Sequence, residues 1–551
     1  MKLTHDGTVA VVDGTELLFS IELEKIANNR RYSSLSDLDQ IAEILASQGL
    51  TPDEIDVFAV DGWQWRDGPL AALPVTAGGR SDTLAAAPYH EIEGVSEVHQ
   101  RYEFAGLTID GRAYPYVSYH HATDHLYSAY CTSPFAARGE DALVLVWDGG
   151  MLPLLYLVRG GTLDVKPLGA LFPLPGSMFA FFAAQFDPFW RDTTGLPLDE
   201  QLRVHLEVAG KAMAYAALGR VEPEAFDLYP KVWKAIDGIP LSEPSRMTET
   251  VRRECDMSFP GLSSADLIAT CQAYLGEVLV SGLRERLAEM PDPPRNLCLA
   301  GGCALNIKWN SLLRGSGLVR EVWVPPFPND SGVALGAACA EMAKTQRAAS
   351  LAWNVYQGPR LAEVSTPPGW IASPCDERGL AQILHQGHPV VFLDGRAELG
   401  PRALGNRSIL AAPVQASMKD RLNEMKARAG YRPVAPVCLE SRAPEIFDPG
   451  TPDPYMLFDH RVRPEWTERV AAVVHVDGTA RLQTINSRQH PRLARVLESY
   501  ERLSGIPLLC NTSANLLGRG FFPDVRSALE WGGTDMVWSD GVLYQRGRRL
   551  A

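Results

Sequence analysis

Two histidines one helical turn apart are the strongest chemical signal in the sequence. His121 and His125 lie in the stretch YHHATDHLYSAY, and on a helix an i, i+4 pair presents both rings to one side. Two histidines alone are more often hydrogen-bonded core residues than metal ligands. Asp148 in WDGG and Asp330 in PNDSG offer carboxylates from turns, although each alone is typical of a turn or helix cap. Together the four residues predict a divalent metal site with mixed nitrogen and oxygen ligands, suited to Fe(II) first and to Mn or Zn as alternatives.

A glycine turn between a predicted strand and a predicted helix is the second signal. In AGGCALN, Gly301 and Gly302 allow close approach of a ligand, and the following helix offers free N–H groups. Asn306 at its end could bond a ribose or a base. A glycine pair before a helix is weak evidence by itself. It gains weight here because it follows a strand late in a predicted duplicated unit, where actin-like proteins and sugar kinases hold adenosine.

Arginines beside glycines and strand ends form a third group, late in the chain. ELGPRALGNRSIL carries Arg402 in a glycine-containing turn. Further residues of this kind follow in LNEMKARAGYRPVAP, ARLQTINSR and LLCNTSANL: Lys426, Arg432, Arg481, Asn511 and Ser513. Scattered charges usually mark a solvated face. Because these lie at turns and strand ends instead of on helix exteriors, they predict a phosphate or nucleotide site.

The helices and strands expected around these residues alternate along the chain, which predicts an α/β fold. TVAVV and ELLFSIEL, joined by Asp13-Gly14, predict a hairpin. DALVLVWDGGMLPLLYLVRGGTLDV repeats the plan with three strands. Two similar lobes facing a cleft and two unrelated hairpins in one domain explain this repetition about equally well. The glycine and prolines of QGPRLAEVSTPPGW indicate a linker, so we expect domains at residues 1–350 and 360–551.

Composition restricts the class of protein. The chain has 551 residues, 46% of them hydrophobic, with a formal net charge of −14. This charge argues against non-specific nucleic-acid binding, which depends on Lys and Arg. The nine cysteines include no CxxC pair, which indicates reduced thiols and a cytoplasmic protein. The start MKLTHDGTVAVVDG has Asp and Gly where a signal peptide needs an apolar run, and no stretch is apolar enough for a membrane span.

The ordered motifs resemble one known family over nearly the whole chain. It comprises the O-carbamoyltransferases that include nodulation proteins and antibiotic-tailoring enzymes of the tobramycin-carbamoyltransferase-like kind. The motifs that carry the resemblance are HDGTVAVVDG, HATDHLYSAYCTSPF, VWDGG, AGKAMAYAALG, AGGCALNIKWN, PPFPNDSG, ELGPRALGNRSIL, LNEMKARAGYRPVAP, DPYMLF, ARLQTI and LLCNTSANL. The resemblance implies a duplicated N-terminal actin-like domain (ASKHA, Kae1-like) and a C-terminal YrdC-like α/β domain.

The resemblance also implies roles for individual residues. The metal ligands would be the two histidines and two aspartates named above, and His5 the base for the acceptor hydroxyl. Lys211 would join the glycine turn in holding a nucleotide, and Met456 would lie near the adenine in the second domain. There carbamoyl phosphate and ATP would be bound by Arg402, Lys426, Arg432, Arg481, Asn511 and Ser513. ELEKIANNRRYS departs from the family's arginine-rich form, so Arg31 is not counted among the expected contacts.

The implied reaction has two steps. The second domain would make carbamoyl-adenylate from carbamoyl phosphate and Mg-ATP. The first would pass the carbamoyl group to a hydroxyl of a small natural product: a macrolide, an ansamycin or a sugar. The stretch from Val60 to Gly94, read as an irregular insertion with Trp63 and Trp65, either lines the acceptor pocket or is a surface loop. A homodimer is a further expectation. The alternatives are a small-molecule kinase of the actin-like superfamily and a tRNA threonylcarbamoyl-type modification protein.

Overall fold

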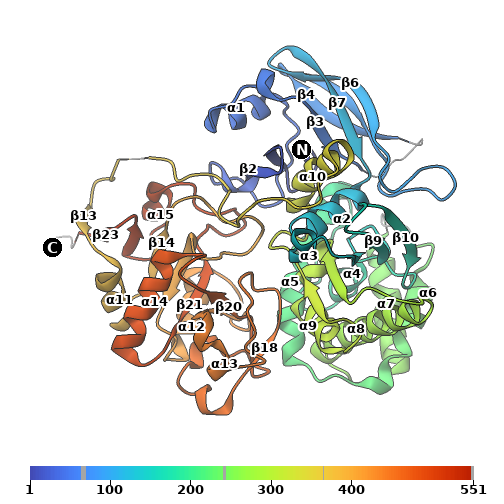
Figure 1. Cartoon of the computed structure of the whole chain (residues 1–551). Helices are drawn as coiled ribbons and strands as arrows, with labels where there is room; N and C mark the ends of the chain where they lie inside the picture. Colours follow the sequence, from blue (N-terminus) through green and yellow to red (C-terminus); the bar gives the residue numbers. More distant parts are fainter. Residues whose placement is uncertain (64–69, 240–242, 364, 548–551) are drawn as a thin grey trace.

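The computed structural model describes residues 1–63, 70–239, 243–363 and 365–547. It is a mixed α/β structure with several sheets. Figure 1 shows the blue-to-yellow part of the chain, residues 1–350, beside the orange-to-red part, residues 360–547. We refer to these as the N-terminal and C-terminal regions. No helix in the described ranges is both long and apolar enough to cross a membrane.

The start of the chain forms the expected hairpin and a small sheet next to it. The hairpin strands pair antiparallel around Asp13 and Gly14, and Gly14 has a φ of 55°, which its turn requires. Met1 lies beside the sheet, because its carbonyl accepts the N–H of Asp61 at 2.9 Å. The strands are β1 (Thr8–Asp13) and β2 (Glu16–Glu22) in the hairpin, and β3 (Phe58–Asp61), β7 (Arg112–Tyr119) and β6 (Tyr102–Ile109) in the sheet, in that order.

One expectation for this part of the chain was wrong. The stretch from Val60 to Gly94 is no irregular insertion, because it contains the hairpin of β4 (Ala71–Ala77) and β5 (Arg80–Ala86). Trp65 lies outside the described residues. Trp63 is placed, and its ring lies beside the predicted metal ligands, as described below.

The second sheet of the N-terminal region brings two predicted site loops to one edge. Its order is β10 (Val165–Ala170), β9 (Leu154–Val158), β8 (Ala142–Val146), β11 (Asn296–Ala300) and β12 (Glu321–Trp323). The first three strands form the predicted antiparallel unit, and β11 runs parallel to β8. Every residue of β8 and β11 is buried, as expected for apolar strands in the middle of a sheet. Because parallel strands end at the same edge, Asp148 after β8 and Gly301 after β11 are neighbours.

Helices cover these sheets and supply the remaining site residues. All residues of α2 (His121–Cys131) are buried, and α2 packs against α10 (Val333–Gln346), which starts just after Asp330. The other helices of this region are α1 (Asp39–Ser47), α3 (Pro134–Arg138), α4 (Met178–Ala183), α5 (Leu198–Tyr215), α6 (Leu228–Ile236), α7 (Pro244–Ser258), α8 (Ser264–Ala288) and α9 (Ile307–Gly315). Both predicted hairpin units are present, but their sheets differ in size and strand order, so the predicted duplication is matched only in part.

The C-terminal region is built on one mixed eight-stranded sheet. Its order is β13 (Trp370–Pro374), β23 (Val542–Arg546), β22 (Met536–Ser539), β14 (Val390–Leu393), β15 (Arg407–Ala411), β21 (Leu508–Ser513), β16 (Ala435–Leu439) and β20 (Gln483–Ile485). A small sheet of β17 (Phe447–Asp448), β18 (His460–Val462) and β19 (Thr479–Ala480) accompanies it. The helices are α11 (Glu377–His385), α12 (Ser417–Met425), α13 (Ala443–Ile446), α14 (Pro491–Ser504) and α15 (Val525–Trp531). A hydrophobic core drawn from residues 380–543 holds these elements together.

Candidate metal centre and anion site

The four predicted metal ligands converge on one point. Ligand atoms of His121, His125, Asp148 and Asp330 all lie within 4.8 Å of one another, and all four residues are buried. Asp330 Oδ1 lies 3.6 Å from His121 Nε2 and 3.4 Å from His125 Nε2. The histidines come from the first turns of α2, and the aspartates come from the loop after β8 and the turn before α10.

The unpaired atoms of this quartet fit a bound cation. Within the described chain, His121 Nε2, both ring nitrogens of His125 and Asp330 Oδ2 have no hydrogen bond although they are buried. Asp330 Oδ2 does lie 2.9 Å from the Lys2 ammonium, as an ion pair. Buried polar atoms without a partner cost free energy, and a divalent cation would use the nitrogens and carboxylates together. The set of two imidazoles and two carboxylates suits Fe(II), Mn or Zn. The residues therefore fit the metal that the sequence predicted.

Two buried residues support this quartet from behind. His121 Nδ1 lies 2.9 and 3.0 Å from the two carboxylate oxygens of Asp61, so Nε2 is the nitrogen left for a metal. Lys2 Nζ bonds Asp61 at 2.8 Å and reaches Asp330 at 2.9 Å. Burial alone would raise the pKa of Asp61, but His121 and Lys2 outweigh burial and lower it below its usual value. Such outer partners fix the orientation and tautomer of a ligating histidine.

His5, the predicted base, lies at the open side of the quartet. Its Nε2 is 3.6 Å from Asp330 Oδ2, its Nδ1 is 2.9 Å from Asp6 Oδ2, and its side chain is 33% exposed. Burial alone would lower the pKa of His5, but the carboxylates of Asp330 and Asp6 raise it above its usual value. The Trp63 ring meets that of His5 at 5.3 Å. An accessible imidazole beside an aromatic wall is suited to take a proton from a bound hydroxyl compound.

The predicted nucleotide turn lies against the metal site, but its residues have structural partners of their own. Gly301 has a φ of 88°, and a Cβ there would lie 2.3 Å from the carbonyl of Trp147. Gly302 donates its N–H to Asp148 Oδ1 at 2.6 Å. The Asn306 side chain caps α9 by accepting the N–H groups of residues 308 and 309. Within the described residues no hydrogen bond joins Lys211 to this turn, and its Nζ bonds Glu207 at 3.3 Å instead.

Six cationic side chains gather where the two regions meet. Four were predicted, namely Arg402, Lys426, Arg432 and Arg481, and the structure adds Arg31 and Arg428. Burial and mutual repulsion lower the pKa values of all of these except Arg31, to about 9 for Arg428 and about 10 for Arg481. The pKa of Arg31 is raised, because Tyr32 and Glu24 outweigh its burial. A guanidinium rarely gives up its proton, so the lowered pKa values express the burial and mutual repulsion of these charges, which a bound anion would offset.

Several donors in this cluster have no acceptor within the described chain. They are the Nε atoms of Arg402 and Arg481 and Nη2 of Arg428. Lys426 Nζ instead bonds the Ser513 carbonyl at 2.5 Å and the Asn515 carbonyl at 3.0 Å. Forked guanidinium donors without partners are suited to phosphate oxygens. We call Arg31, Arg402, Lys426, Arg428, Arg432 and Arg481 the cation cluster.

The other predicted residues of the C-terminal region differ in position. Asn511 is buried and donates to the Ala403 carbonyl at 3.1 Å and to Gln483 at 2.7 Å, while its Oδ1 is unpaired. Ser513 lies beside Lys426. Met456 is 2% exposed and lies in a hydrophobic core with residues of the N-terminal region. Met456 therefore packs at the interface between the regions and presents almost no surface to an adenine.

The cation cluster and the glycine turn are neighbours across the interface. Arg402 Nη2 approaches the Leu305 carbonyl at 3.5 Å, one residue before Asn306. Gly400 has a φ of 81°, and a Cβ there would lie 2.1 Å from the Pro326 carbonyl, four residues before Asp330. The loop carrying Arg402 therefore lies against the glycine turn and against the loop that carries the predicted ligand Asp330.

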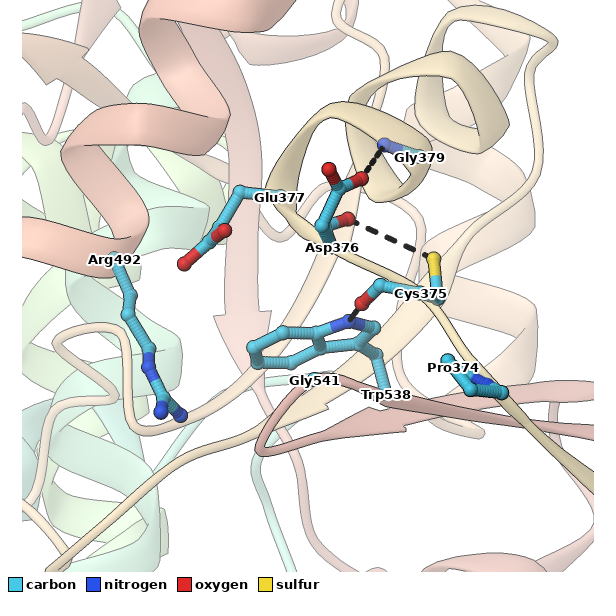
Figure 2. Close-up of a pocket in the computed structure, with 8 residues that line it drawn as sticks. All are labelled: Pro374, Cys375, Asp376, Glu377, Gly379, Arg492, Trp538 and Gly541. Atoms are coloured by element: carbon cyan, nitrogen blue, oxygen red, sulfur yellow. Dashed lines mark hydrogen bonds between the residues drawn. The ribbon is translucent and has the colours of Figure 1, made fainter.

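The cavity drawn in Figure 2 is a different place. It has a volume of about 570 Å³ and lies at the outer side of the C-terminal region, near β13 and α11. Its polar lining is already partnered: Arg492 bonds Asp394 at 2.7 Å, and Trp538 Nε1 donates to the Cys375 carbonyl at 2.8 Å. None of the predicted site residues lines it.

The structure assembles contacts that the sequence motifs did not reveal. Asp61 and Lys2 were not singled out, although Lys2 lies three residues before His5 and Asp61 ends a strand. Arg31 was set aside, yet it lies in the cation cluster. Tyr89 was also missed: its hydroxyl donates to Asp148 Oδ2 at 3.0 Å, and its ring stacks on His121 at 4.6 Å.

Comparisons with known proteins agree on one family. A model described as "Carbamoyltransferase N-terminus" matches residues 1–339, and one described as "Carbamoyltransferase C-terminus" matches residues 381–544. Nodulation protein U of Rhizobium tropici is 46% identical, over 100% of this chain and 96% of its own length. The 3'-hydroxymethylcephem-O-carbamoyltransferase of Streptomyces clavuligerus is 33% identical, over 99% of this chain and 98% of its own length.

Solved structures give weaker similarity. The activator of the 2-hydroxyisocaproyl-CoA dehydratase from Clostridium difficile covers 66% of this chain and 97% of its own, with 14% identity and a TM-score of 0.29. Full-length HypF in its phosphate- and nucleotide-bound form covers 43% of this chain and 44% of its own, with 14% identity and a TM-score of 0.24. TM-scores this low do not establish a shared fold. The match of both family models and of full-length relatives does establish the family: the chain belongs to the carbamoyltransferases, and it is an O-carbamoyltransferase of the nodulation protein U and cephem carbamoyltransferase type.

Proposed function

We propose that the chain makes carbamoyl-adenylate in its C-terminal region and transfers the carbamoyl group to a hydroxyl in its N-terminal region. The observation that carries the proposal is the pairing of two unlike sites in contact. One is a buried cation cluster with unpaired donors, and the other is a quartet of metal-binding side chains with an accessible imidazole at its edge. A one-step transfer from carbamoyl phosphate would need only one of them.

In the first step, water releases phosphate from carbamoyl phosphate to leave carbamate. A carbamate oxygen then attacks the α-phosphorus of ATP, and pyrophosphate leaves. Phosphate, pyrophosphate and ATP are all multiply charged anions. The cation cluster would bind and orient them through the unpaired donors of Arg402, Arg428 and Arg481, with Mg²⁺ accompanying ATP.

In the second step, the acceptor hydroxyl attacks the carbamoyl carbon, and the bond to AMP breaks. His5 would take the hydroxyl proton at Nε2, the nitrogen that faces Asp330. His121, His125, Asp148 and Asp330 would hold a metal ion, which would supply Lewis-acid stabilisation of negative charge. The Trp63 ring packs against the rings of His5 and Tyr89 at the edge of this site, where keeping water out would protect the mixed anhydride from hydrolysis.

The architecture we infer follows the same division. A boundary between residues 350 and 360 separates an actin-like N-terminal domain from a YrdC-like C-terminal domain. The parallel pair β8 and β11, with site loops at one edge, and the separate core of residues 380–543 support this division. The acceptor is proposed to be a small hydroxylated natural product, since a nodulation protein and a cephem carbamoyltransferase are among the relatives. The two family matches cover both regions, which neither the kinase nor the tRNA alternative explains.

The experiment is to incubate the intact chain with carbamoyl phosphate, MgATP, Fe(II) and panels of hydroxylated sugars, lipo-oligosaccharides, cephems and macrolides. Mass spectrometry is expected to find one acceptor class heavier by one carbamoyl group, with AMP and pyrophosphate formed. Carbamoylation that proceeds equally well without ATP would contradict the adenylate step.

A further inference from the structure

The start of the stretch ELEKIANNRRYS, from Glu22 to Lys25, has no assigned role in the proposed reaction, yet it is buried between the two regions. Glu22 is 4% exposed and Lys25 is 1% exposed. Glu22 ends β2 in the N-terminal region, and Lys25 lies in the short 3-10 turn that follows it. Charged side chains are almost never buried this deeply unless they are paired, so their partners indicate what the stretch does.

The partners of this pair belong to the C-terminal region. Lys25 Nζ donates to Glu22 Oε1 at 2.6 Å and to the carbonyls of Glu398 and Gly400 at 2.6 and 2.8 Å. Glu22 Oε1 accepts the N–H of Gly400 at 2.7 Å. The turn from residue 398 to 400 is thus bound through both its donors and its acceptors. It also passes close to the Pro326 carbonyl, because a Cβ at Gly400 would lie 2.1 Å from that oxygen.

This turn leads directly to Arg402 of the cation cluster. The far side of the loop is fixed by Glu398, whose carboxylate accepts the N–H groups of Leu404 at 2.5 Å and of Arg407 at 3.3 Å. Arg402 lies between these anchors. Its guanidinium is repelled by Arg481, Arg31 and Arg432, so without anchors the loop would relax to separate the charges.

We infer that Glu22 and Lys25 are positioning residues that hold the Arg402 loop in its anion-binding form. The inference rests on the proposed function of the cation cluster. Removing the Lys25 ammonium leaves two carbonyls buried without a donor and the Glu22 carboxylate buried without its counter-charge, which is costly where water cannot replace them. The anion site of the C-terminal region therefore depends on the N-terminal region for its shape as well as for Arg31.

The test measures the affinity of the full chain for inorganic pyrophosphate and for MgATP by calorimetry. Lys25→Met is expected to weaken pyrophosphate binding on the order of ten- to a hundredfold, the loss that a misplaced binding group causes. Glu22→Leu should weaken it similarly, whereas Glu22→Gln keeps an acceptor for the Gly400 N–H and should restore most of the affinity. Lys231→Met, at an exposed lysine of α6, is the matched control. Metal affinity should be unchanged in all four variants.

The outcomes separate the inference from the proposed function. Equal pyrophosphate affinity in Lys25→Met and the unaltered chain overturns the inference and leaves the proposed function standing. Equal losses in Glu22→Leu and Glu22→Gln overturn it as well, because positioning requires the acceptor. An unaltered chain that binds neither pyrophosphate nor MgATP overturns the proposed function. Thermal unfolding checks the fold of each variant. If Lys25→Met does not fold, the comparison of Glu22→Leu with the nearly isosteric Glu22→Gln still tests the inference.

Discussion

The support behind His121 allows a sharp prediction for Asp61→Asn. The asparagine can still accept a hydrogen bond from His121 Nδ1, but it has no charge to offset Lys2. In the unaltered chain Lys2 divides its charge between Asp61 at 2.8 Å and Asp330 at 2.9 Å. After the substitution Asp330, a predicted metal ligand, faces the full ammonium charge, and His121 becomes a weaker donor to the metal. Loss of such an outer partner costs about 10- to 100-fold in metal affinity, or about 1.4 to 2.7 kcal/mol.

The assay is competition for Fe(II) or Zn(II) between the purified full chain and a chromophoric chelator. Asp56→Asn is the matched control, because Asp56 is exposed and lies just before the same strand. Since Lys2 keeps Asp330 as a partner, the variant is expected to remain folded, which thermal unfolding checks. Unchanged affinity in Asp61→Asn, or an equal loss in Asp56→Asn, would refute the view that Asp61 orients His121 for a metal.

Three further predictions concern the cation cluster and the interface. Lys426→Met and Arg432→Met are each expected to abolish pyrophosphate release from ATP and carbamoyl phosphate; release at the unaltered rate would count against the cluster as the adenylate site. Anion binding should weaken as pH rises, because the pKa of Lys426 is lowered and the free site therefore loses a proton at a lower pH than an ordinary lysine does, whereas a bound anion favours the protonated form. Calorimetry in buffers of different ionisation enthalpy should show proton uptake on binding. An affinity that rises with pH would contradict this sign. The two halves of the chain, residues 1–350 and 360–551, can be expressed separately and mixed at low concentration. The mixture should carbamoylate far less acceptor per ATP consumed than the intact chain. An equal yield of product per ATP, without reassociation of the halves, would refute a shielded passage between the sites.

The sequence predicted the elements whose signals are local. Apolar runs identified β8 and β11, and the Asp13-Gly14 turn identified the first hairpin. The quartet of ligands was also predictable, because an i, i+4 histidine pair and two turn aspartates are visible without tertiary information. The β4–β5 hairpin was missed because Pro74 and neighbouring glycines resemble a loop, although proline is tolerated in edge strands such as these.

Other parts of the site depend on contacts that no local pattern contains. Lys2 and Asp61 are 59 positions apart, and Lys25 and Glu398 are 373 positions apart. Contacts between residues this far apart in the sequence are decided by how the chain folds as a whole. Asn306 illustrates a local pattern with two meanings: asparagine is a preferred helix cap, and its side chain caps α9, whereas its contact with a ligand stays a prediction.

If one chain divides two chemical steps between two sites in contact, loss of one site should leave the other step intact. The division is tested with His125→Ala, supplied with carbamoyl phosphate, MgATP and acceptor, by following pyrophosphate, carbamoyl-adenylate and carbamoylated product in the same reaction. This variant is expected to bind metal poorly and to make no product, yet still to release pyrophosphate and accumulate carbamoyl-adenylate. Loss of pyrophosphate release together with transfer, or transfer at the unaltered rate, would contradict the division.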